Sequence, residues 1–172
     1  MEGNNIPRRA KVLVVGGGGR EHAIVDALSR SERVEKIFCA PGNAGIARQA
    51  KCVPLEDTQV DELAEFAENE GIDLTVVGPE VSLAAGIVDE FEARGLKIFG
   101  PSKAAARIES SKDFAKELMA KYNVPTAAYR TFSDYDEALA YVNAGKLPVV
   151  LKYDGLAAGK GVVVAQTLEE AD

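Results

Sequence analysis

Residues 12–29, VLVVGGGGREHAIVDALS, decide the fold that we expect for this chain. The Val/Leu run within Lys11–Val15 is too apolar for a strand with one face in water, and it predicts a strand buried inside a parallel sheet. Four glycines, Gly16–Gly19, follow that strand, and Glu21–Arg30 then shows the apolar spacing of a helix. A buried strand that passes through glycines into a helix favours a layered α/β fold.

The same alternation of strand and helix patterns continues to about residue 100. We expect a buried strand at Leu74–Val77 and further strands at Lys36–Cys39, Lys51–Pro54 and Lys97–Phe99. We expect helices at Gln59–Asn69, between a Thr58 cap and Gly71, and at Leu83–Ala93, before Gly95. Repeated β–α units predict an α/β fold with a Rossmann-like, doubly wound parallel sheet.

After Pro101 the pattern changes. Two helices are expected without a strand between them, at Ser102–Glu109 and Ser111–Tyr122. Further on we expect a strand at Tyr129–Phe132, a helix at Tyr135–Ala144 that starts from Ser133, strands at Pro148–Lys152 and Val162–Gln166, and a helix opened by the capping box Thr167–Glu170. We therefore divide the chain into a flexible leader at 1–10, a first domain at 11–101, a helical connector at 102–123 and a second, incomplete domain at 124–172.

Three loops should meet at the ligand-binding edge of the first domain, because doubly wound sheets bind ligands at the carboxyl ends of their strands. They are GGGGREH at 16–22, APGNAG at 40–45 and VGPE at 77–80. In the first loop, the bare amides of Gly17, Gly18 and Gly19, the helix dipole and the forked cation of Arg20 form an anion cradle that suits a phosphate. The alternative is a tight turn that only packs the strand on the helix.

The glycine loop does not match the GxGxxG fingerprint of dinucleotide-binding proteins. Glu21 or His22 occupies the position of the third glycine in the two possible registers, and the ribose-binding carboxylate expected about 20 residues later is missing. Asn43 could bond a ribose, but nothing favours nicotinamide, so an oxidoreductase is the weaker interpretation. His22 either faces a ligand or packs, without an acid–base role. Glu80 either bonds hydroxyls or an amine, or is a solvated loop carboxylate.

A second glycine loop lies between two Val-rich strands in residues 149–165, VVLKYDGLAAGKGVVVA. Lys152 ends the first strand and Lys160 lies in the loop, but no GK[ST] opens a helix, which excludes a P-loop. A hairpin with a mobile glycine flap suits a lid over a triphosphate, with the lysines on phosphate oxygens. The alternative is an ordinary hairpin with surface lysines.

The composition is that of a globular protein: 172 residues, 47% of them hydrophobic and 27% charged. A net charge of −7 argues against a nucleic-acid partner, and no apolar run is long enough for a membrane span. Cys39 and Cys52 have neither metal-ligand nor CxxC spacing, so we expect two free thiols in a reducing, cytoplasmic compartment. The residues before Lys11 lack the apolar stretch of a secretory signal.

Five motifs in order, VLVVGGGGREHA, APGNAG, VVGPE, GPSKAAARIESSK and LKYDGLAAGKGV, resemble the phosphoribosylamine–glycine ligase (glycinamide ribonucleotide synthetase) family of the ATP-grasp superfamily. The resemblance covers nearly the whole chain from Lys11. It implies a pre-ATP-grasp domain followed by the start of an ATP-grasp domain. It also implies ATP-dependent joining of glycine to 5-phosphoribosylamine in purine synthesis, through glycyl phosphate. Another ATP-grasp ligase with a different acid or amine is the alternative.

The resemblance also assigns site residues. The phosphoribosylamine site would comprise Gly17, Gly18, Gly19, Arg20, Glu21, Asn43, Pro79 and Glu80. The ATP site would comprise Lys112, Lys152, Gly155, Gly159, Lys160 and Gly161. Ligands for Mg²⁺ or Mn²⁺ are expected beyond Asp172, since family members are longer, and we expect this chain alone to lack ligase activity. Ser82 stands where many members carry proline, and Tyr153 where alanine is common.

Overall fold

The structure is a computed structural model that describes residues 9–157 and 160–171. The chain divides into two compact units, residues 1–106 and residues 107–172, and each is described by itself. This division falls inside the stretch for which a helical connector is expected, and the boundaries at residues 10, 101 and 123 stay a prediction. None of the helices in the described residues has the length and apolar character of a membrane span.

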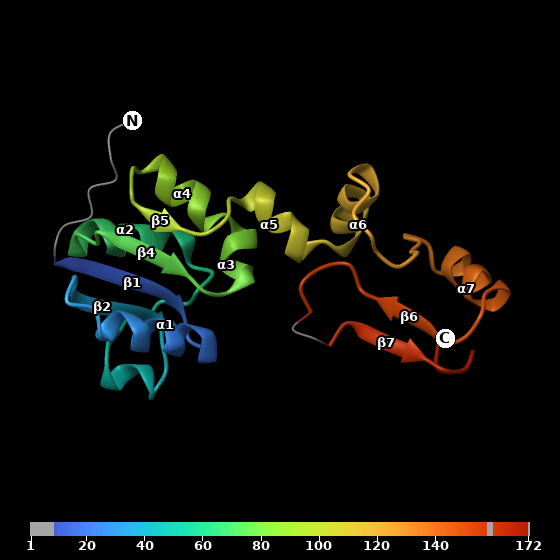
Figure 1. Ribbon diagram of the computed structural model, residues 1–172, viewed down its shortest axis with the longest axis horizontal. Coiled ribbons are helices and arrows are strands. Elements are labelled where there is room, and N and C mark those ends of the chain that lie inside the picture. The colour runs from blue at the N-terminus through green and yellow to red at the C-terminus, as the bar shows by residue number, and fades with distance from the viewer. Residues whose placement is uncertain (1–8, 158–159, 172) are drawn as a thin grey trace. The chain divides into compact units, whose positions relative to one another are not determined.

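The first unit is built on a five-stranded sheet in which every pairing is parallel. Its strands are β1 (Ala10–Gly16), β2 (Val34–Pro41), β3 (Lys51–Cys52), β4 (Leu74–Val77) and β5 (Ile98–Phe99). Their order across the sheet is β3-β2-β1-β4-β5 (Figure 1). Because the order reverses on either side of β1, the sheet is doubly wound, which confirms the predicted fold class.

Helices cover both faces of this sheet. They are α1 (Gly19–Ser29), the 3₁₀ turn η1 (Ile46–Arg48), α2 (Val60–Glu70), α3 (Glu80–Ala85) and α4 (Ile87–Ala93). On one face Leu13 and Phe38 pack with Phe91 of α4, and on the other Val14 packs with Val25 of α1. Figure 1 shows α1 on the side of the sheet opposite α2 and α4. Burial on both faces explains why β1 is apolar at every position from Val12 to Val15.

Two details of the first unit correct the predictions from sequence. The expected helix Leu83–Ala93 is two helices, because Gly86 adopts a left-handed φ of 100° that ends α3 before α4 begins. Thr58 does not cap α2: Gln59 is the N-cap residue, and its side-chain oxygen accepts from the Glu56 amide and not from an amide of the helix. Gly71 ends α2 in the left-handed conformation, as predicted.

The second unit contains helices and one hairpin. Its elements are the second half of α5 (Lys103–Ser110), α6 (Lys112–Lys121), α7 (Tyr135–Ala144), β6 (Val149–Lys152) and β7 (Val162–Ala165), with β6 and β7 antiparallel. Asp134, and not Ser133, caps α7 through the Glu137 amide. The Thr167 hydroxyl accepts from the Glu170 amide at 3.3 Å, but residues 169–171 form a turn and not the expected helix.

The strand expected at Tyr129–Phe132 is absent, and residues 124–132 run without regular structure. Side chains of α6 hold this segment instead of a sheet ladder. Lys116 Nζ donates to Thr126 Oγ1 at 2.7 Å and to the Ala127 carbonyl at 2.8 Å, and Thr131 Oγ1 donates to Asp113 at 2.5 Å. The segment is therefore held by polar contacts with the helix that precedes it, and its residues from 124 to 131 are exposed.

Both cysteines are free thiols, as predicted, and they are partners in the register of β2 and β3. Burial, with smaller contributions from Cys52 and Glu21, raises the pKa of the Cys39 thiol to about 12. Cys52 is partly exposed.

Iodoacetamide at pH 8 should therefore modify Cys52 and leave Cys39 unmodified in the folded protein. The thiolate is the reacting species, and a pKa near 12 leaves about one Cys39 in 10⁴ ionised at that pH. Peptide mass spectrometry after timed labelling measures both sites, and the urea-unfolded protein should label at both. Equal labelling rates in the native protein would contradict the buried position of Cys39.

Candidate functional site

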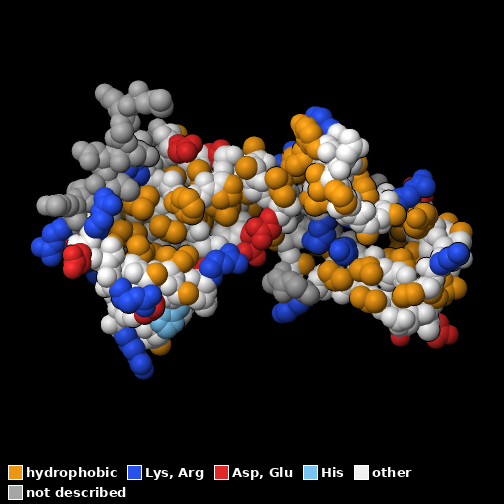
Figure 2. All heavy atoms as spheres, viewed as in Figure 1, with side chains coloured by type: hydrophobic (Ala, Val, Ile, Leu, Met, Phe, Trp, Pro, Cys, Tyr) orange, Lys and Arg blue, Asp and Glu red, His pale blue; other side chains and the backbone are white. Residues whose placement is uncertain are grey.

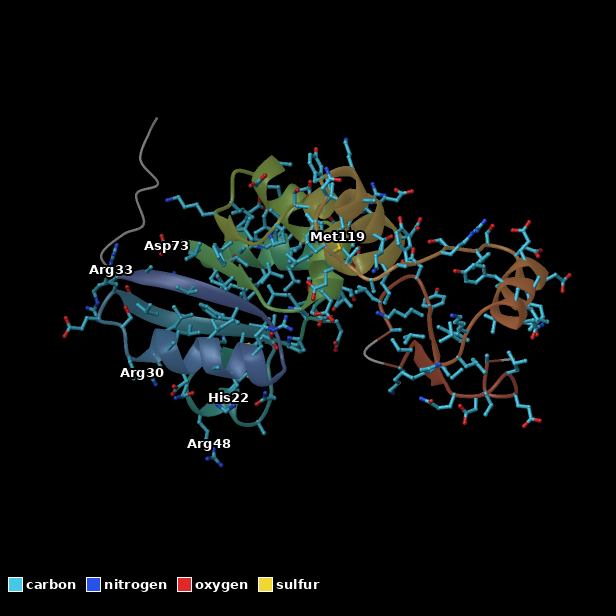
Figure 3. The ribbon with its side chains drawn as sticks, turned by 45° about the vertical axis from the view of Figure 1, so that its right-hand side comes forward. His22, Arg30, Arg33, Arg48, Asp73 and Met119 are labelled. Carbon is cyan, nitrogen blue, oxygen red and sulfur yellow. The ribbon has the colours of Figure 1, made fainter. Side chains whose placement is uncertain are left out.

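The carboxyl ends of three strands bring the predicted loops to one edge of the first unit. Gly16 pairs with Pro41, and Val15 pairs with Val77, so β1, β2 and β4 end at the same level. The loops that follow are GGGGREH, APGNAG and VGPE. In Figure 3, Arg33 and Asp73 lie at the opposite end of the strands. The sheet thus assembles the three loops as predicted.

The four glycines of the first loop have different surroundings. A Cβ at Gly17 would lie 2.6 Å from the Gly42 carbonyl oxygen, and one at Gly18 would lie 2.9 Å from Glu21 Oε2. Gly16 has a φ of 116° and would place a Cβ 2.7 Å from Glu21 Cγ. A Cβ at Gly19, the first residue of α1, would meet no atom within 4 Å. Packing therefore accounts for Gly16 and Gly17, whereas Gly18 and Gly19 are both exposed and only the Glu21 carboxylate lies close to Gly18.

Glu21 lies inside this turn. Its side chain is buried, and Oε2 accepts a hydrogen bond from the Gly18 amide at 2.6 Å. Gly78 of the VGPE loop makes room for it, because a Cβ there would lie 2.0 Å from Glu21 Oε1. The carboxylate thus caps α1 and supports the β1 and β4 loops from below. Gly78 was not among the predicted site residues. Its position at the end of a strand, next to the loop of four glycines, was a signal that another side chain packs closely against its backbone.

Arg20 joins the start of α1 to the third loop. Its Nη1 donates to the Gly78 carbonyl and lies 3.7 Å from Glu80 Oε2. Both side chains remain partly in water, with 61% of Arg20 and 35% of Glu80 exposed. Glu80 is the first residue of α3, after the N-cap Pro79. A guanidinium and a carboxylate therefore stand together on the open side of the loops, beside the N-terminus of α1.

Asn43 fastens the second loop to the first. Its Nδ2 donates to the Gly17 carbonyl at 2.8 Å, and its Oδ1 accepts from the amides of Gly45 at 2.8 Å and Ile46 at 2.9 Å. The oxygen is committed to two amides, so only one N–H of this side chain is left for a ligand. Asn43 thus holds the loops together in the structure.

His22 packs on the second loop: a Cβ at Gly45 would lie 2.7 Å from its Cε1. It also lines an open depression of about 530 Å³ beside α1, together with Gly19, Arg48 and Gln49. Figure 3 shows His22 on α1 and Arg48 in the segment beside it. Arg48 adds a cation near the N-terminus of α1, and it was missed because the short turn that carries it has no apolar period.

The second unit carries the other predicted residues. Lys112 begins α6, and its Nζ donates to the Gly155 carbonyl at 2.8 Å. Gly155 has a φ of 129° and would place a Cβ 3.0 Å from the Tyr153 ring.

The far end of the loop is also tightly packed. The amide of Lys160 donates to the Ala157 carbonyl, and a Cβ at Gly161 would lie 2.8 Å from Ala157 Cβ. Gly159 lies outside the described residues. The hairpin and its tightly packed glycines confirm that the loop joins two antiparallel strands.

Lys152 ends β6 on an exposed apolar face. It pairs with Val162, and Val150 pairs with Val164, so these four side chains share one side of the hairpin. Val150, Val162 and Val164 are each between 44% and 53% exposed. Figure 2 shows hydrophobic side chains gathered over β6 and β7. This face combines an apolar surface with a cation at one end.

The described residues, 9–157 and 160–171, contain no group of three or more His, Cys, Asp or Glu arranged to hold a metal ion. The resemblance places the ligands for Mg²⁺ or Mn²⁺ beyond Asp172, so that expectation stays a prediction.

Two family models match consecutive parts of the chain, which together span residues 10–172. The model described as phosphoribosylglycinamide synthetase, N domain, matches residues 10–109, and the one described as phosphoribosylglycinamide synthetase, ATP-grasp (A) domain, matches residues 110–172.

Among curated relatives, the phosphoribosylamine–glycine ligase of Caldanaerobacter subterraneus is 60% identical over 161 residues, and that of Neisseria meningitidis serogroup B is 59% identical over 161 residues. Both alignments cover 94% of this chain, but only 39% and 38% of the relatives. The chain thus spans less than two fifths of the length of the curated relatives it matches.

Solved structures share the fold. The phosphoribosylamine–glycine ligase of Thermotoga maritima is 32% identical with a TM-score of 0.71, over 94% of this chain and 37% of that one. An ADP complex of N5-carboxyaminoimidazole ribonucleotide synthetase has a TM-score of 0.77 over 99% of this chain and 44% of that one. At 19% identity this second likeness shows the fold alone.

Proposed function

Because the chain belongs to the phosphoribosylglycinamide synthetase family, we propose that it forms the amino-terminal part of a phosphoribosylamine–glycine ligase. The reaction joins glycine to 5-phosphoribosylamine and gives glycinamide ribonucleotide, ADP and phosphate. The glycine carboxylate takes the γ-phosphoryl group of ATP, and the substrate amine then displaces phosphate from glycyl phosphate and loses a proton. The observation that carries this proposal is the match of both family models, in order, over residues 10–172.

The first unit would bind the phosphoribosylamine. Gly19 and Arg20, at the open N-terminus of α1, would receive the phosphate, since N-terminal amides and a guanidinium both favour an anion. Glu80 would bond the ribose hydroxyls or the amine. Three further members of the predicted set, Gly17, Gly18 and Pro79, would contribute backbone, and Glu21 and Asn43 would hold the loops in place.

The second unit would contribute to the ATP site. The exposed valines beside Lys152 suit a flat apolar adenine, and the lysine at the strand end suits a phosphate. Lys112 and Lys160 would add further cations, and Gly155, Gly159 and Gly161 would let the loop approach the nucleotide. Free Cys39 and Cys52 support a reducing compartment, and we include the cytoplasm in this proposal.

An activity assay on the complete protein that the gene encodes tests the function. ADP release from ATP should require glycine and 5-phosphoribosylamine together, and omission of either should abolish it. A panel of other acids and amines distinguishes the alternative, because an ATP-grasp ligase of different specificity would release ADP with one of them and not with this pair.

Arg20→Ala should raise the KM for 5-phosphoribosylamine by about 10- to 100-fold, the effect of losing one charged hydrogen bond to a phosphate. The KM for ATP should change less than twofold. Arg33→Ala is the matched control, because Arg33 is exposed at the opposite end of the strands (Figure 3) and should leave both constants unchanged. A rise in the KM for ATP alone would reverse the assignment of the two loops.

A further inference from the structure

We propose that Asp154 is a positioning residue of the nucleotide site, which fastens the start of the second glycine loop to the N-terminus of α6. The proposal rests on the proposed function, because it takes this loop and Lys112 to serve ATP. It concerns contacts within the second unit only.

The Asp154 carboxylate caps the N-terminus of α6 in addition to the N-cap residue, although it lies 42 residues from Lys112 in the sequence. Its Oδ1 accepts from the amide of Lys112 at 2.6 Å and from that of Asp113 at 3.2 Å. Its Oδ2 accepts from the Ser111 hydroxyl at 3.1 Å. Ser111 is itself the N-cap and accepts from the Phe114 amide at 3.1 Å. Together the two side chains satisfy three of the four N-terminal amides that a helix leaves unbonded.

Lys112 closes the connection from the other direction. Its amide binds Asp154, and its Nζ donates to the carbonyl of the next residue, Gly155, at 2.8 Å. Backbone and side chain of one lysine therefore grip two successive residues of the loop. The left-handed φ of Gly155 turns the chain at that point, immediately after the carboxylate. The entry of the loop is thus fixed to α6 by four hydrogen bonds to groups of Ser111, Lys112 and Asp113.

This arrangement serves a site that collects cations from distant parts of the sequence. Lys112 and Lys152 lie 40 residues apart in the chain, and both are proposed to approach phosphate oxygens. Asp154 follows Lys152 by two residues and binds the N-terminus of α6, so it links the strand of one lysine to the helix of the other. When charged groups are already held in place, less free energy is lost in ordering them as the ligand binds.

The carboxylate keeps its charge over the working pH range. Partial desolvation raises the pKa of Asp154, but the amides of Asp113 and Lys112, the Ser111 hydroxyl and the Lys112 charge outweigh it, so the pKa lies below the ordinary 3.8. A lowered carboxyl pKa means that the contact is complete above pH 3.8 and is lost as the pH falls through the lower, folded value.

Asp154→Asn in the complete protein tests the proposal against the matched control Asp134→Asn. Asp134 caps α7 in the same unit through the Glu137 amide, a hydrogen bond that lies away from the described part of the glycine loop in the sequence. Asparagine has the same shape as aspartate and keeps one acceptor oxygen, so both variants should fold. Asp154→Asn should raise the KM for ATP about tenfold with kcat reduced less than threefold, and should speed amide exchange at Lys112 and Asp113 at least tenfold, the effect of losing a charged acceptor. Asp134→Asn should change exchange at Glu137 only.

Two results would overturn the proposal. Unchanged amide exchange at Lys112 and Asp113 would mean that the contact does not hold in solution. Faster exchange with an ATP KM within twofold of the parent would mean that the contact positions nothing. If the parent protein shows no turnover with glycine and 5-phosphoribosylamine, the proposed function fails separately, and the affinity of the two variants for MgATP by calorimetry then decides the role of Asp154.

Discussion

Gly16→Ala should lower the free energy of unfolding of the first unit by about 2–6 kcal/mol, as the sum of backbone strain and overpacking. Gly16 has a φ of 116°, which side chains rarely adopt. Its added Cβ would lie 2.7 Å from Glu21 Cγ and 2.9 Å from Pro79 Cδ. Glu21 cannot yield easily, because it is 4% exposed and its carboxylate binds the Gly18 amide. The added methyl group must therefore displace the Glu21 side chain, which supports the loops after β1 and β4.

Urea unfolding followed by circular dichroism measures this loss, and Gly19→Ala is the matched control within the same four glycines. A Cβ at Gly19 meets no atom within 4 Å and the residue is helical, so alanine there should leave stability unchanged or raise it by up to about 1 kcal/mol. Equal unfolding midpoints for Gly16→Ala and the parent would show that the turn is looser than the structure indicates.

The sequence predicts the first unit well because its signals are local. Each buried strand is a run of apolar residues, and each loop at the carboxyl edge is marked by glycine or proline, so the fold class and the ligand edge follow from general rules of α/β sheets. The predictions fail where one residue overrides the pattern, as Gly86 does between α3 and α4. They also fail at the strand expected at Tyr129–Phe132. Side-chain hydrogen bonds, such as that from Lys116 to Thr126, hold this segment in place of strand pairing.

The site is only partly readable from sequence, because its decisive contacts join distant residues. The four glycines looked like a single anion cradle. The structure separates Gly16 and Gly17, which packing explains, from the exposed Gly18 and Gly19. That separation depends on Gly78, 57 residues after Glu21, whose missing side chain lets the carboxylate enter the turn. No local pattern encodes such a pair.

Lys152→Ala in the complete protein should lower kcat/KM for ATP by about 10²–10³-fold, the effect of removing one preorganised charge from a phosphoryl-transfer site. Lys152 ends β6 on the face that carries Val150, Val162 and Val164. These valines are 44–53% exposed, and contact of their apolar surface with water is unfavourable. An apolar ring packed against them would remove that surface from water. The lysine at the end of this face would then meet whatever polar group the ring carries, which for ATP is the phosphate chain.

The control for this prediction is Lys146→Ala, an exposed lysine that precedes β6 and lies outside the hairpin face. It has the same charge change and should leave kcat/KM for ATP within twofold of the parent. Steady-state kinetics at saturating glycine and 5-phosphoribosylamine measure both variants, and thermal unfolding checks that Lys152→Ala stays folded. If Lys152→Ala kept parental kinetics, the lysine would not touch the nucleotide, and the valine face would need a different occupant.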